Sequence, residues 1–211
     1  MNKYYEELNN SYDNIERQLM PDESIIWKGK PKKSAFVINS SIKMMPFALL
    51  WLAFDSMFII GLFKGDGLGA MGVFFTLFFA IHLMPVWIWL SNMLTAGKRW
   101  KNTEYAVTDK RILLRNGLIG YQYESIYYTD IANVSLRVGT IDKMLKVGDI
   151  CIHQNAYSSG NSEMASILDV EDVERVFAIV QQTVMDIQTD IHYPNALRPD
   201  NNPGYKTQYR P

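Results

Sequence analysis

Residues 44–63 read MMPFALLWLAFDSMFIIGLF, and residues 68–94 read LGAMGVFFTLFFAIHLMPVWIWLSNML. Only the four residues Lys64–Gly67 separate these two apolar runs. Because twenty residues of α-helix rise about 30 Å, the thickness of a bilayer's hydrocarbon core, each run is long enough to cross a membrane. We therefore predict a transmembrane hairpin over residues 44–94, with spans at about 44–63 and 68–94. A buried helical pair in a soluble protein is the alternative, and it fits the length of the runs less well.

The distribution of charge around the two runs predicts the orientation of the hairpin. No acidic residue lies between Glu23 and Asp55, although five lysines fall there. Three further basic residues, Lys98, Arg99 and Lys101, follow the second run. By the positive-inside rule, both flanks are cytoplasmic and the turn faces outward. We expect a multi-pass protein of the bacterial cytoplasmic (inner) membrane with both termini in the cytoplasm.

Tryptophans favour the same orientation. Trp87, Trp89 and Trp100 lie near the proposed inner end of the second run, as in an aromatic belt at a membrane interface. Trp51 lies deeper within the first run and fits no such belt.

The rest of the chain divides around the hairpin. Residues 1–43 form a cytoplasmic N-terminal segment, in which residues 1–20 have the spacing of a short amphipathic helix. Residues 102–190 change to an alternation of apolar and polar residues, which predicts short strands. Residues 191–211 are rich in Pro, Asn, Tyr and Gln without any period, so we expect a disordered tail.

About six short strands and one helix are predicted within residues 102–190. Tyr105–Thr108 and Arg111–Arg115 flank a tight turn at Asp109, and Ala132–Val138 alternates as a half-buried strand. Asp169 is the expected N-cap of a closing helix with an apolar stripe. The fold class is therefore α+β: a transmembrane hairpin followed by a small antiparallel barrel or sandwich capped by one C-terminal helix.

The string EYAVTDKRILLRNG at residues 104–117 resembles the opening of the bacterial pleckstrin-homology-like (PH-like) membrane proteins, the YdbS-like family. The resemblance covers about residues 22–188 and extends to further blocks at Glu23–Trp27, Tyr128–Ile131, Val147–Ile150 and Asp169–Val173. It implies a seven-stranded, partly open barrel with one helix at its end, so a seventh strand is expected in Thr140–Lys146. It implies no defined activity, because this fold is a general binding scaffold.

No motif in the chain indicates an enzyme, a cofactor or a metal centre. A GxGxxG match at residues 67–72 follows an apolar run instead of a strand, and a flexible turn explains it better than a dinucleotide site does. The histidines at 82, 153 and 192 are far apart and lack the spacing of metal ligands. Cys151 and His153 share one face of a predicted strand, yet such a pair is more often a coincidence than an activated nucleophile. We expect no catalytic residues.

Two ionisable residues, Asp55 and His82, fall inside the apolar runs. Such groups are costly in hydrocarbon and are a hypothesis of function by default. The two can pair if the helices are offset, or each can meet a neighbouring subunit. We favour a hydrogen-bonding role in helix packing or oligomerisation over a proton or ion path, because the runs offer little other polar lining.

Five basic residues are candidates for contact with lipid head groups or with a partner: Lys98, Arg99, Lys101, Lys110 and Arg111. They are expected where the soluble domain meets the membrane. Eukaryotic PH-like domains that bind phosphoinositides use basic residues near the first hairpin, a turn comparable to the one that holds Lys110 and Arg111. General attraction to anionic lipid explains these residues more simply than recognition of one head group.

The leading interpretation is a membrane-anchored cytoplasmic PH-like module for interaction or assembly, without enzymatic activity. A sensor of anionic lipid head groups at the inner membrane face is the first alternative. A subunit of a small transporter or channel that uses Asp55 and His82 is the second. The expected partners are the lipid bilayer and proteins or copies of the same chain, and not nucleic acid.

Overall fold

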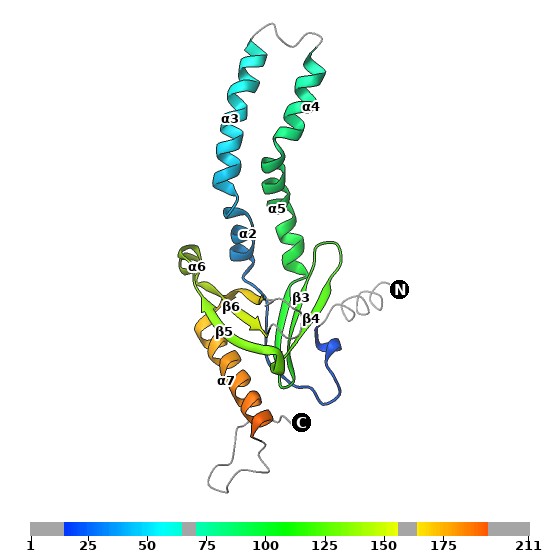
Figure 1. Ribbon diagram of the computed structural model, residues 1–211, viewed down its shortest axis with the longest axis vertical. Coiled ribbons are helices and arrows are strands. Elements are labelled where there is room, and N and C mark those ends of the chain that lie inside the picture. The colour runs from blue at the N-terminus through cyan, green and yellow to red at the C-terminus, as the bar shows by residue number, and fades with distance from the viewer. Residues whose placement is uncertain (1–14, 65–70, 156–163, 194–211) are drawn as a thin grey trace, which may run out of the picture.

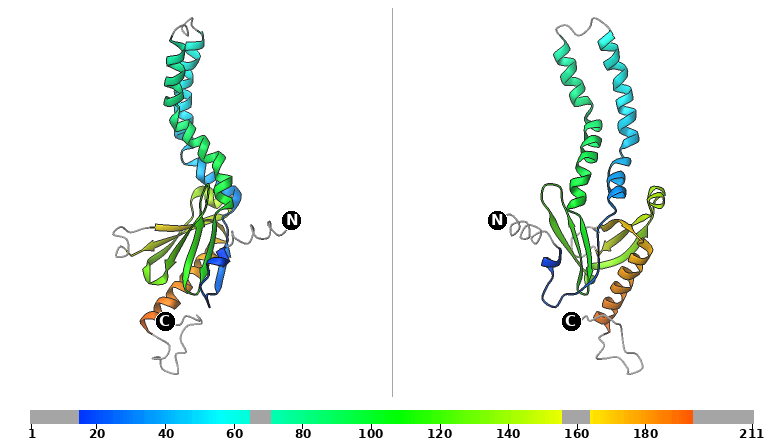
Figure 2. Two further views of the ribbon diagram at one scale, coloured as in Figure 1. Left: turned by 90° about the vertical axis from the view of Figure 1, so that its right-hand side faces the viewer. Right: turned by 180° about the vertical axis from the view of Figure 1, so that it is seen from behind.

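Two antiparallel sheets and a stem of helices that rises from them make up the computed structural model (Figure 1). It describes residues 15–64, 71–155 and 164–193. The sheets and one long helix form a rounded domain, and the stem leads away from one end of it in all the views of Figures 1 and 2. The chain is thus a mixed α/β protein in which the stem helices are separate from the two sheets.

The first sheet has four strands in the order β1-β2-β3-β4. They are β1 (Ile25–Gly29), β2 (Glu104–Thr108), β3 (Arg111–Asn116) and β4 (Gln122–Tyr127). β1 pairs with β2 although the whole stem separates them in the sequence. Both faces of β2 are covered, by the main core on one side and by the 3-10 helix η1 (Ile15–Gln18) on the other. Ile15 of η1 packs against Ala106 and Leu113.

The second sheet has three strands, β5 (Ile131–Arg137), β6 (Val147–Gln154) and β7 (Met164–Glu171). A short 3-10 helix, η2 (Tyr128–Asp130), leads into β5, and helix α6 (Thr140–Leu145) connects β5 to β6. Apolar side chains from both sheets meet in one core, which includes Ile112, Ile126, Ile150 and Ile167. The antiparallel strands predicted from the sequence are present, but those described form two separate sheets and not a closed barrel.

Helix α7 (Val173–His192) closes the core, as the apolar stripe predicted. Val176, Val180 and Ile187 face the core. Gln188 donates hydrogen bonds to the backbone carbonyls of Tyr128 in η2 and Ile131 at the start of β5. The N-cap is Asp172, with a left-handed backbone (φ 51°), so the prediction of Asp169 as N-cap is wrong. Asp169 lies in β7 because the strand continues past a bulge before the helix begins.

The stem consists of α2 (Lys33–Ile42), α3 (Met45–Lys64), α4 (Gly72–His82) and α5 (Met84–Lys101). α2 and the start of α3 pack along α5, whereas α3 and α4 spread apart toward the far end (Figures 1 and 2). At the base, the Trp100 indole N–H donates to the carbonyl oxygen of Pro31 at 2.7 Å. Both chain segments that enter the stem are thereby fixed to each other at the domain surface.

The second apolar run is broken at Leu83, so the prediction of one continuous helix over residues 68–94 is wrong. α4 and α5 meet there at an angle of 54°. Pro85, in the first turn of α5, explains the break. Proline has no N–H to donate, and its ring would clash with the carbonyl of Ile81 in a continuous helix.

Two tryptophans bind carbonyl oxygens that face this break. Trp87 donates from Nε1 to the carbonyl of Ala80 at 2.9 Å, and Trp51 of α3 donates to the carbonyl of His82 at 2.9 Å. A buried carbonyl without a donor is costly in apolar surroundings, so these bonds stabilise the bend. Trp51, which fits no aromatic belt, has a structural role here.

One helix in the described part of the chain is long and apolar enough by itself to cross a membrane, over Met45–Leu62. α4 and α5 pass the same test only as a bent pair. The described structure therefore gives one clear apolar helix where the sequence predicts two spans. The predicted turn and its GxGxxG match fall mostly on residues 65–70, outside the described residues.

The seventh strand comes from the N-terminal segment and not from Thr140–Lys146, which forms α6 and its left-handed C-cap. β1 carries Trp27, whose side chain packs against the main core. The domain therefore needs residues before the stem, and a boundary at residue 102 cuts it. Of the predicted N-terminal helix only η1 is described, and the predicted tail lies almost wholly outside the described residues.

Candidate functional site

The structure divides the five basic candidates into two groups. Lys98, Arg99 and Lys101 lie in the last turn of α5, where the stem meets the domain. Lys110 and Arg111 lie beside the β2–β3 turn, at the other end of the first sheet. β2 runs away from α5 along its whole length before this turn, so the expectation that all five gather at the base of the stem is wrong.

Arg111 belongs to a buried network. Its Nε and Nη2 atoms donate to the two carboxylate oxygens of Glu23, each at 3.1 Å, and Thr108 donates to Glu23 at 2.8 Å. Burial opposes the ionisation of Glu23, but these bonds and one from the Met20 backbone outweigh it and lower its pKa. The side chain of Arg111 is thus engaged inside the protein. Lys110 donates to the carbonyl of Pro21 at 3.0 Å.

A polar cavity of about 610 Å³ opens where the stem joins the domain, between α2, α5, α6 and the second sheet. Its charged lining residues are Lys43, Arg99, Arg137, Asp142, Asp149 and Asp169. The first two come from the stem and the others from the domain, so this cavity lies at the joint between the two parts.

Asn39 of α2 ties the stem to this joint. Its amide Nδ2 donates to Asp142 Oδ1 at 2.8 Å and to a carboxylate oxygen of Asp169. Asp149 accepts a hydrogen bond from the backbone N–H of Asp169 at 3.0 Å and one from Arg137 at 2.8 Å. Three carboxylates are therefore held close together by one amide, one guanidinium and backbone N–H groups.

Asp169 is the most strained member of this cluster. It is buried in a bulge of β7 with a positive φ of 53°, and its carbonyl oxygen accepts the backbone N–H of Lys32 at 2.8 Å. Burial, together with the charges of Asp149 and Asp142, raises the pKa of Asp169 to about 6, although the bond from Asn39 acts in the opposite direction. α2 is therefore bonded to Asp169 at two points, through the side chain of Asn39 and the backbone N–H of Lys32.

Asp55 and His82 meet inside the stem. The Nδ1 atom of His82 lies 3.0 and 3.1 Å from the two carboxylate oxygens of Asp55, whose side chain is almost wholly buried. The His82 ring lies between those of Trp51 and Phe78, at centroid distances of 5.2 and 5.1 Å. An apolar cleft of about 500 Å³ between α3 and α4 has this pair at one end. Of the two arrangements considered from the sequence, this structure of a single chain has the two residues in contact with each other.

Cys151 and His153 are not in contact as a nucleophile and its base would be. Cys151 is buried in β6, and the Nε2 atom of His153 lies 3.2 Å from the hydroxyl of Ser135 on β5. Among residues 15–64, 71–155 and 164–193, no group of three or more His, Cys, Asp or Glu side chains is placed to hold a metal ion.

Sequence reasoning missed the Asn39–Asp169 cluster. Its members come from α2, α6, β6 and β7, and no two of them share a motif. Asn39 reads only as part of an Asn-Ser-Ser triplet, and Asp169 reads as a helix cap. The sequence does offer one signal for such a cluster. Asp residues beside glycine or near strand ends often accept hydrogen bonds from backbone N–H groups, and Asp149 and Asp169 lie at such positions.

Comparisons with known proteins place the chain in a family. The model of the bacterial PH domain family matches residues 48–184, which is more than half of the chain. The chain belongs to the bacterial PH domain family. Among solved structures, it is similar to a DUF1696 family protein with a pleckstrin-homology domain from Shewanella loihica PV-4. That similarity has 15% identity and a TM-score of 0.31, and it covers 42% of this chain and 73% of the other. No curated protein matches the chain.

Membership in the bacterial PH domain family suggests an interaction module. The match covers most of α3, the helices α4 and α5, and all the strands except β1.

Proposed function

We propose that this bacterial PH domain is a membrane-anchored interaction module without enzymatic activity. The stem would cross the inner membrane as a hairpin, with α3 as one span and the bent α4–α5 pair as the other. The domain and both termini would lie on the cytoplasmic side. There the domain would bind protein partners or a second copy of the chain.

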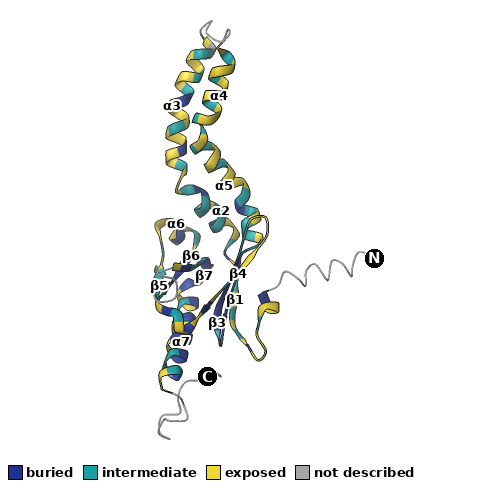
Figure 3. Ribbon diagram, turned by 45° about the vertical axis from the view of Figure 1, so that its right-hand side comes forward, coloured by how far each residue is buried: buried dark blue, intermediate teal, exposed yellow. Residues whose placement is uncertain are grey.

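The exposed apolar surface of the stem carries this proposal. Only 11% of the Met45–Leu62 window is buried within the protein, and many large apolar residues of the stem are exposed. Exposed residues, in yellow, follow the stem along its length in Figure 3. Among the most exposed are Leu50, Met57, Val73, Leu77 and Ile81. A soluble monomer rarely exposes a continuous apolar patch of this extent, because its contact with water is unfavourable. A bilayer would cover it.

The charges at the base of the stem support the proposed orientation. Lys98 and Lys101 are exposed at the end of α5, and Lys33 is exposed at the start of α2. Cytoplasmic flanks of membrane spans carry such an excess of basic residues. The described residues 45–64 and 71–82 contain three ionisable side chains. Two are the paired Asp55 and His82, and the third is Lys64 at the far end of α3.

The open sheet edges are the proposed docking surfaces of the domain. In the described part of the chain, β4 pairs only with β3, and β5 pairs only with β6. Such edges present unpaired backbone groups that can add a strand from a partner. Tyr127 is an exposed aromatic residue on β4 and supplies a side-chain contact for such a strand.

The Asp55–His82 contact favours a packing role over the transport alternative. Each side chain has the other as a polar partner, and aromatic rings flank the histidine. We infer that the pair fixes α3 against the α4–α5 bend, where Trp51 also binds.

Two measurements test the proposal. Alkaline carbonate extraction of membranes tests anchoring: the protein should stay in the pellet, and release into the supernatant would contradict it. A photo-reactive phenylalanine analogue at Tyr127, compared with the same analogue at the exposed Tyr193 after α7, tests the edge in native membranes. We expect one discrete adduct from position 127 that position 193 does not give. Equal labelling from both positions would reject β4 as the docking edge.

A further inference from the structure

Two exposed apolar tips lie on either side of the stem. One is the β3–β4 loop, residues 117–121, where Ile119 is 98% exposed and Leu118 and Tyr121 are also exposed. The other is α6, where Met144 is 79% exposed. A single exposed apolar residue is common on protein surfaces and needs no explanation. Here the location of the two tips is what matters.

Both tips face the same way as the stem. In Figure 1 the β3–β4 loop rises beside α5 and α6 lies beside α2, so that the base of the stem stands between them. Figure 2 shows the same arrangement from behind. A plane drawn across the base of the stem would therefore touch both tips.

The loop tip is held in position by the end of α5. The side-chain amide of Asn102 donates to the carbonyl oxygens of Gly117 and Gly120, at 3.4 and 3.1 Å. Gly117 has a positive φ of 155°, and a Cβ atom there would lie 2.1 Å from the Gly120 oxygen, so this compact loop needs glycine at position 117.

The α6 tip is held in position by α2. Lys32 donates from Nζ to the carbonyl oxygen of Leu145 at 3.1 Å, and Asn39 donates to Asp142 at 2.8 Å. Lys146 caps the helix with a left-handed backbone (φ 55°), which turns the chain back into β6. Each tip is therefore fixed to the stem before any ligand binds.

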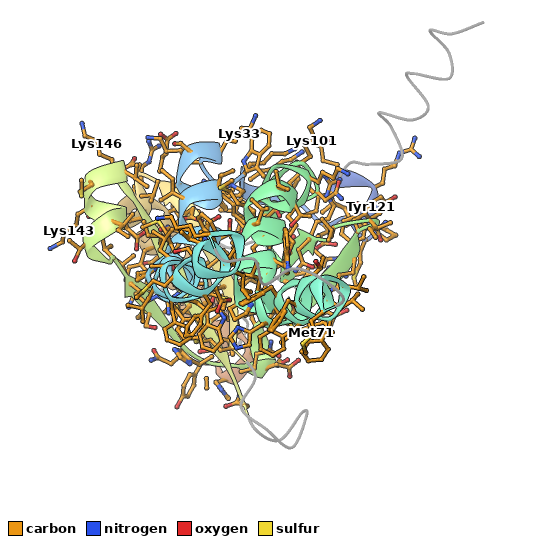
Figure 4. All side chains as sticks on the ribbon, turned by 90° about the horizontal axis from the view of Figure 1, so that it is seen from above. Lys33, Met71, Lys101, Tyr121, Lys143 and Lys146 are labelled. Carbon is orange, nitrogen blue, oxygen red and sulfur yellow. The ribbon has the colours of Figure 1, made fainter. Side chains whose placement is uncertain are left out.

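Exposed lysines accompany the tips. Lys143 and Lys146 flank Met144 on α6, and Lys33 and Lys101 lie at the base of the stem (Figure 4). Seen along the stem, the four lysines lie along one side of the molecule, from Lys143 and Lys146 at the left to Lys33 and Lys101 at the top, with Tyr121 of the loop beside Lys101. Apolar side chains next to lysines are the composition of surfaces that lie in the head-group layer of anionic membranes.

We infer that the β3–β4 loop and α6 dock into the head-group layer of the same bilayer that the stem crosses. Ile119 and Met144 enter the boundary between head groups and acyl chains, and the four lysines contact lipid phosphates. This inference rests on the proposed membrane anchoring and adds to it. The domain would sit on the membrane at two points besides the stem, in one fixed orientation, with the Lys110 end of the first sheet pointing away from the lipid.

Fluorophores on single cysteines in the full chain test this inference. Cys151 is replaced by Ala, and an environment-sensitive label is attached at Ile119→Cys or Met144→Cys. Met185→Cys on the exposed side of α7 is the matched control, since Met185 is also an exposed apolar residue. The proteins are placed in nanodiscs of phosphatidylcholine, with or without phosphatidylglycerol, so that both membrane faces are accessible to solutes.

We expect labels at 119 and 144 to shift their emission to the blue, to be quenched by brominated lipids and to be shielded from iodide. The label at 185 should show no blue shift and no quenching by brominated lipids, and iodide should quench it. If the labels at 119 and 144 match the one at 185 while the protein stays in the disc, tip docking is wrong and the anchoring proposal stands. If the protein does not enter discs, anchoring itself fails.

The lysines are tested by charge reversal. The double variant Lys143→Glu/Lys146→Glu should reduce lipid quenching at position 144 several-fold in discs with phosphatidylglycerol, and less in phosphatidylcholine alone. The label at position 119 should change little, which controls for general disruption of the domain. Equal quenching at 144 with and without the reversal would show that the lysines do not contact anionic lipid.

Discussion

Arg111 and Glu23, which are 88 residues apart in the sequence, form a two-point ion pair inside the domain, with both N···O distances at 3.1 Å. The pair joins the segment before β1 to the start of β3. Thr108 connects the same carboxylate to the β2–β3 turn through its hydroxyl, which also accepts the backbone N–H of Arg111. The sequence offers Arg111 as a lipid contact, and the fold uses it to lock the N-terminal segment in place.

Removing one partner of this pair should be strongly destabilising. Arg111→Ala leaves the Glu23 carboxylate buried without its main donor, and such a change typically costs about 3–5 kcal/mol. The control is Arg175→Ala, because Arg175 pairs with Asp172 at 4.0 Å on the surface, where ion pairs contribute little. Thermal unfolding of the full chain in detergent measures both. A similar fall in melting temperature for the two variants would contradict the stabilising role of the Glu23–Arg111 pair.

Acidification should weaken the domain through Glu23. Its pKa is lowered in the folded protein, so the stability it adds is present above the unfolded value of 4.5 and is lost as the pH falls through the folded value. The melting temperature should therefore fall below about pH 4.5, and Glu23→Gln should flatten this part of the curve. A curve with the same slope in both proteins would assign the acid sensitivity to other groups.

Asp169 should act in the opposite direction. Its pKa is raised from 3.8 to about 6, so its contribution is most favourable below pH 3.8 and is lost as the pH rises through 6. Asp169→Asn keeps an oxygen that accepts from Asn39 and suits the positive φ, but removes the charge. We expect the free energy of unfolding of the variant, measured against that of the unaltered protein, to be about 1–3 kcal/mol more favourable at pH 7 than at pH 4. Melting temperatures across this range test it, and a gain that does not depend on pH would refute the charge argument.

A double-mutant cycle should detect coupling between Asp55 and His82. Asp55→Leu, His82→Phe and the double variant should give a coupling energy of about 0.5–2 kcal/mol, the range of hydrogen bonds between helices in membranes. The measurement is unfolding of the full chain in mild detergent. Additive effects would mean that the 3.0 Å contact contributes nothing measurable. Loss of an oligomer in the Asp55→Leu variant would indicate that the residue also supports assembly.

The isolated fragment 102–193 should fail to fold. It lacks β1, exposes the edge of β2, leaves Arg111 without Glu23 and removes Trp27 from the core. Fusing residues 15–32 to residues 102–193 through a short Gly/Ser linker should restore the fold, because Trp100 and Pro31 are already in contact at the base of the stem. Circular dichroism and cooperative melting distinguish the two. A folded fragment without β1 would show that β1 is dispensable.

Local patterns predicted most of the domain correctly. The alternation in Arg111–Arg115 and Ala132–Val138 corresponds to β3 and β5, and the stripe through Val176 and Val180 corresponds to α7. β5 and α7 pack one face on the core, so the period of their apolar residues carries the information. β3 is buried on both faces, and its run of apolar residues beside the turn at Asp109 predicted it. The family resemblance is likewise confirmed by the match to the bacterial PH domain family.

Features that depend on distant contacts escaped the sequence. Ile25–Gly29 is short and becomes a strand only because β2 pairs with it after the stem. Thr140–Lys146 has too few residues for a clear period and is a helix held by Asn39 and Lys32. The break at Leu83 had a local signal in Pro85, which the overall hydropathy of the run outweighed.

The candidate site was harder to predict for the same reason. Asp55 and His82 could be picked out because ionisable groups in apolar runs are rare. Arg111 and Asp169 could not be assigned, since their roles are set by Glu23 and by Asn39, which lie far away in the sequence. A charged residue in a strand or turn gives no sign of whether its partner is inside the protein or outside it.

The position of the stem between β1 and β2 has a consequence for how the protein is made. A ribosome releases β1 first, then the apolar helices, and only afterwards the strand with which β1 must pair. Until then Ile25–Gly29 lacks its partner strand β2 and Glu23 lacks Arg111, so the first sheet cannot close before the helices have left the ribosome. If the stem crosses the membrane as proposed, the helices enter it while the domain is still unformed, and completion of the sheet follows insertion and brings the two ends of the stem together.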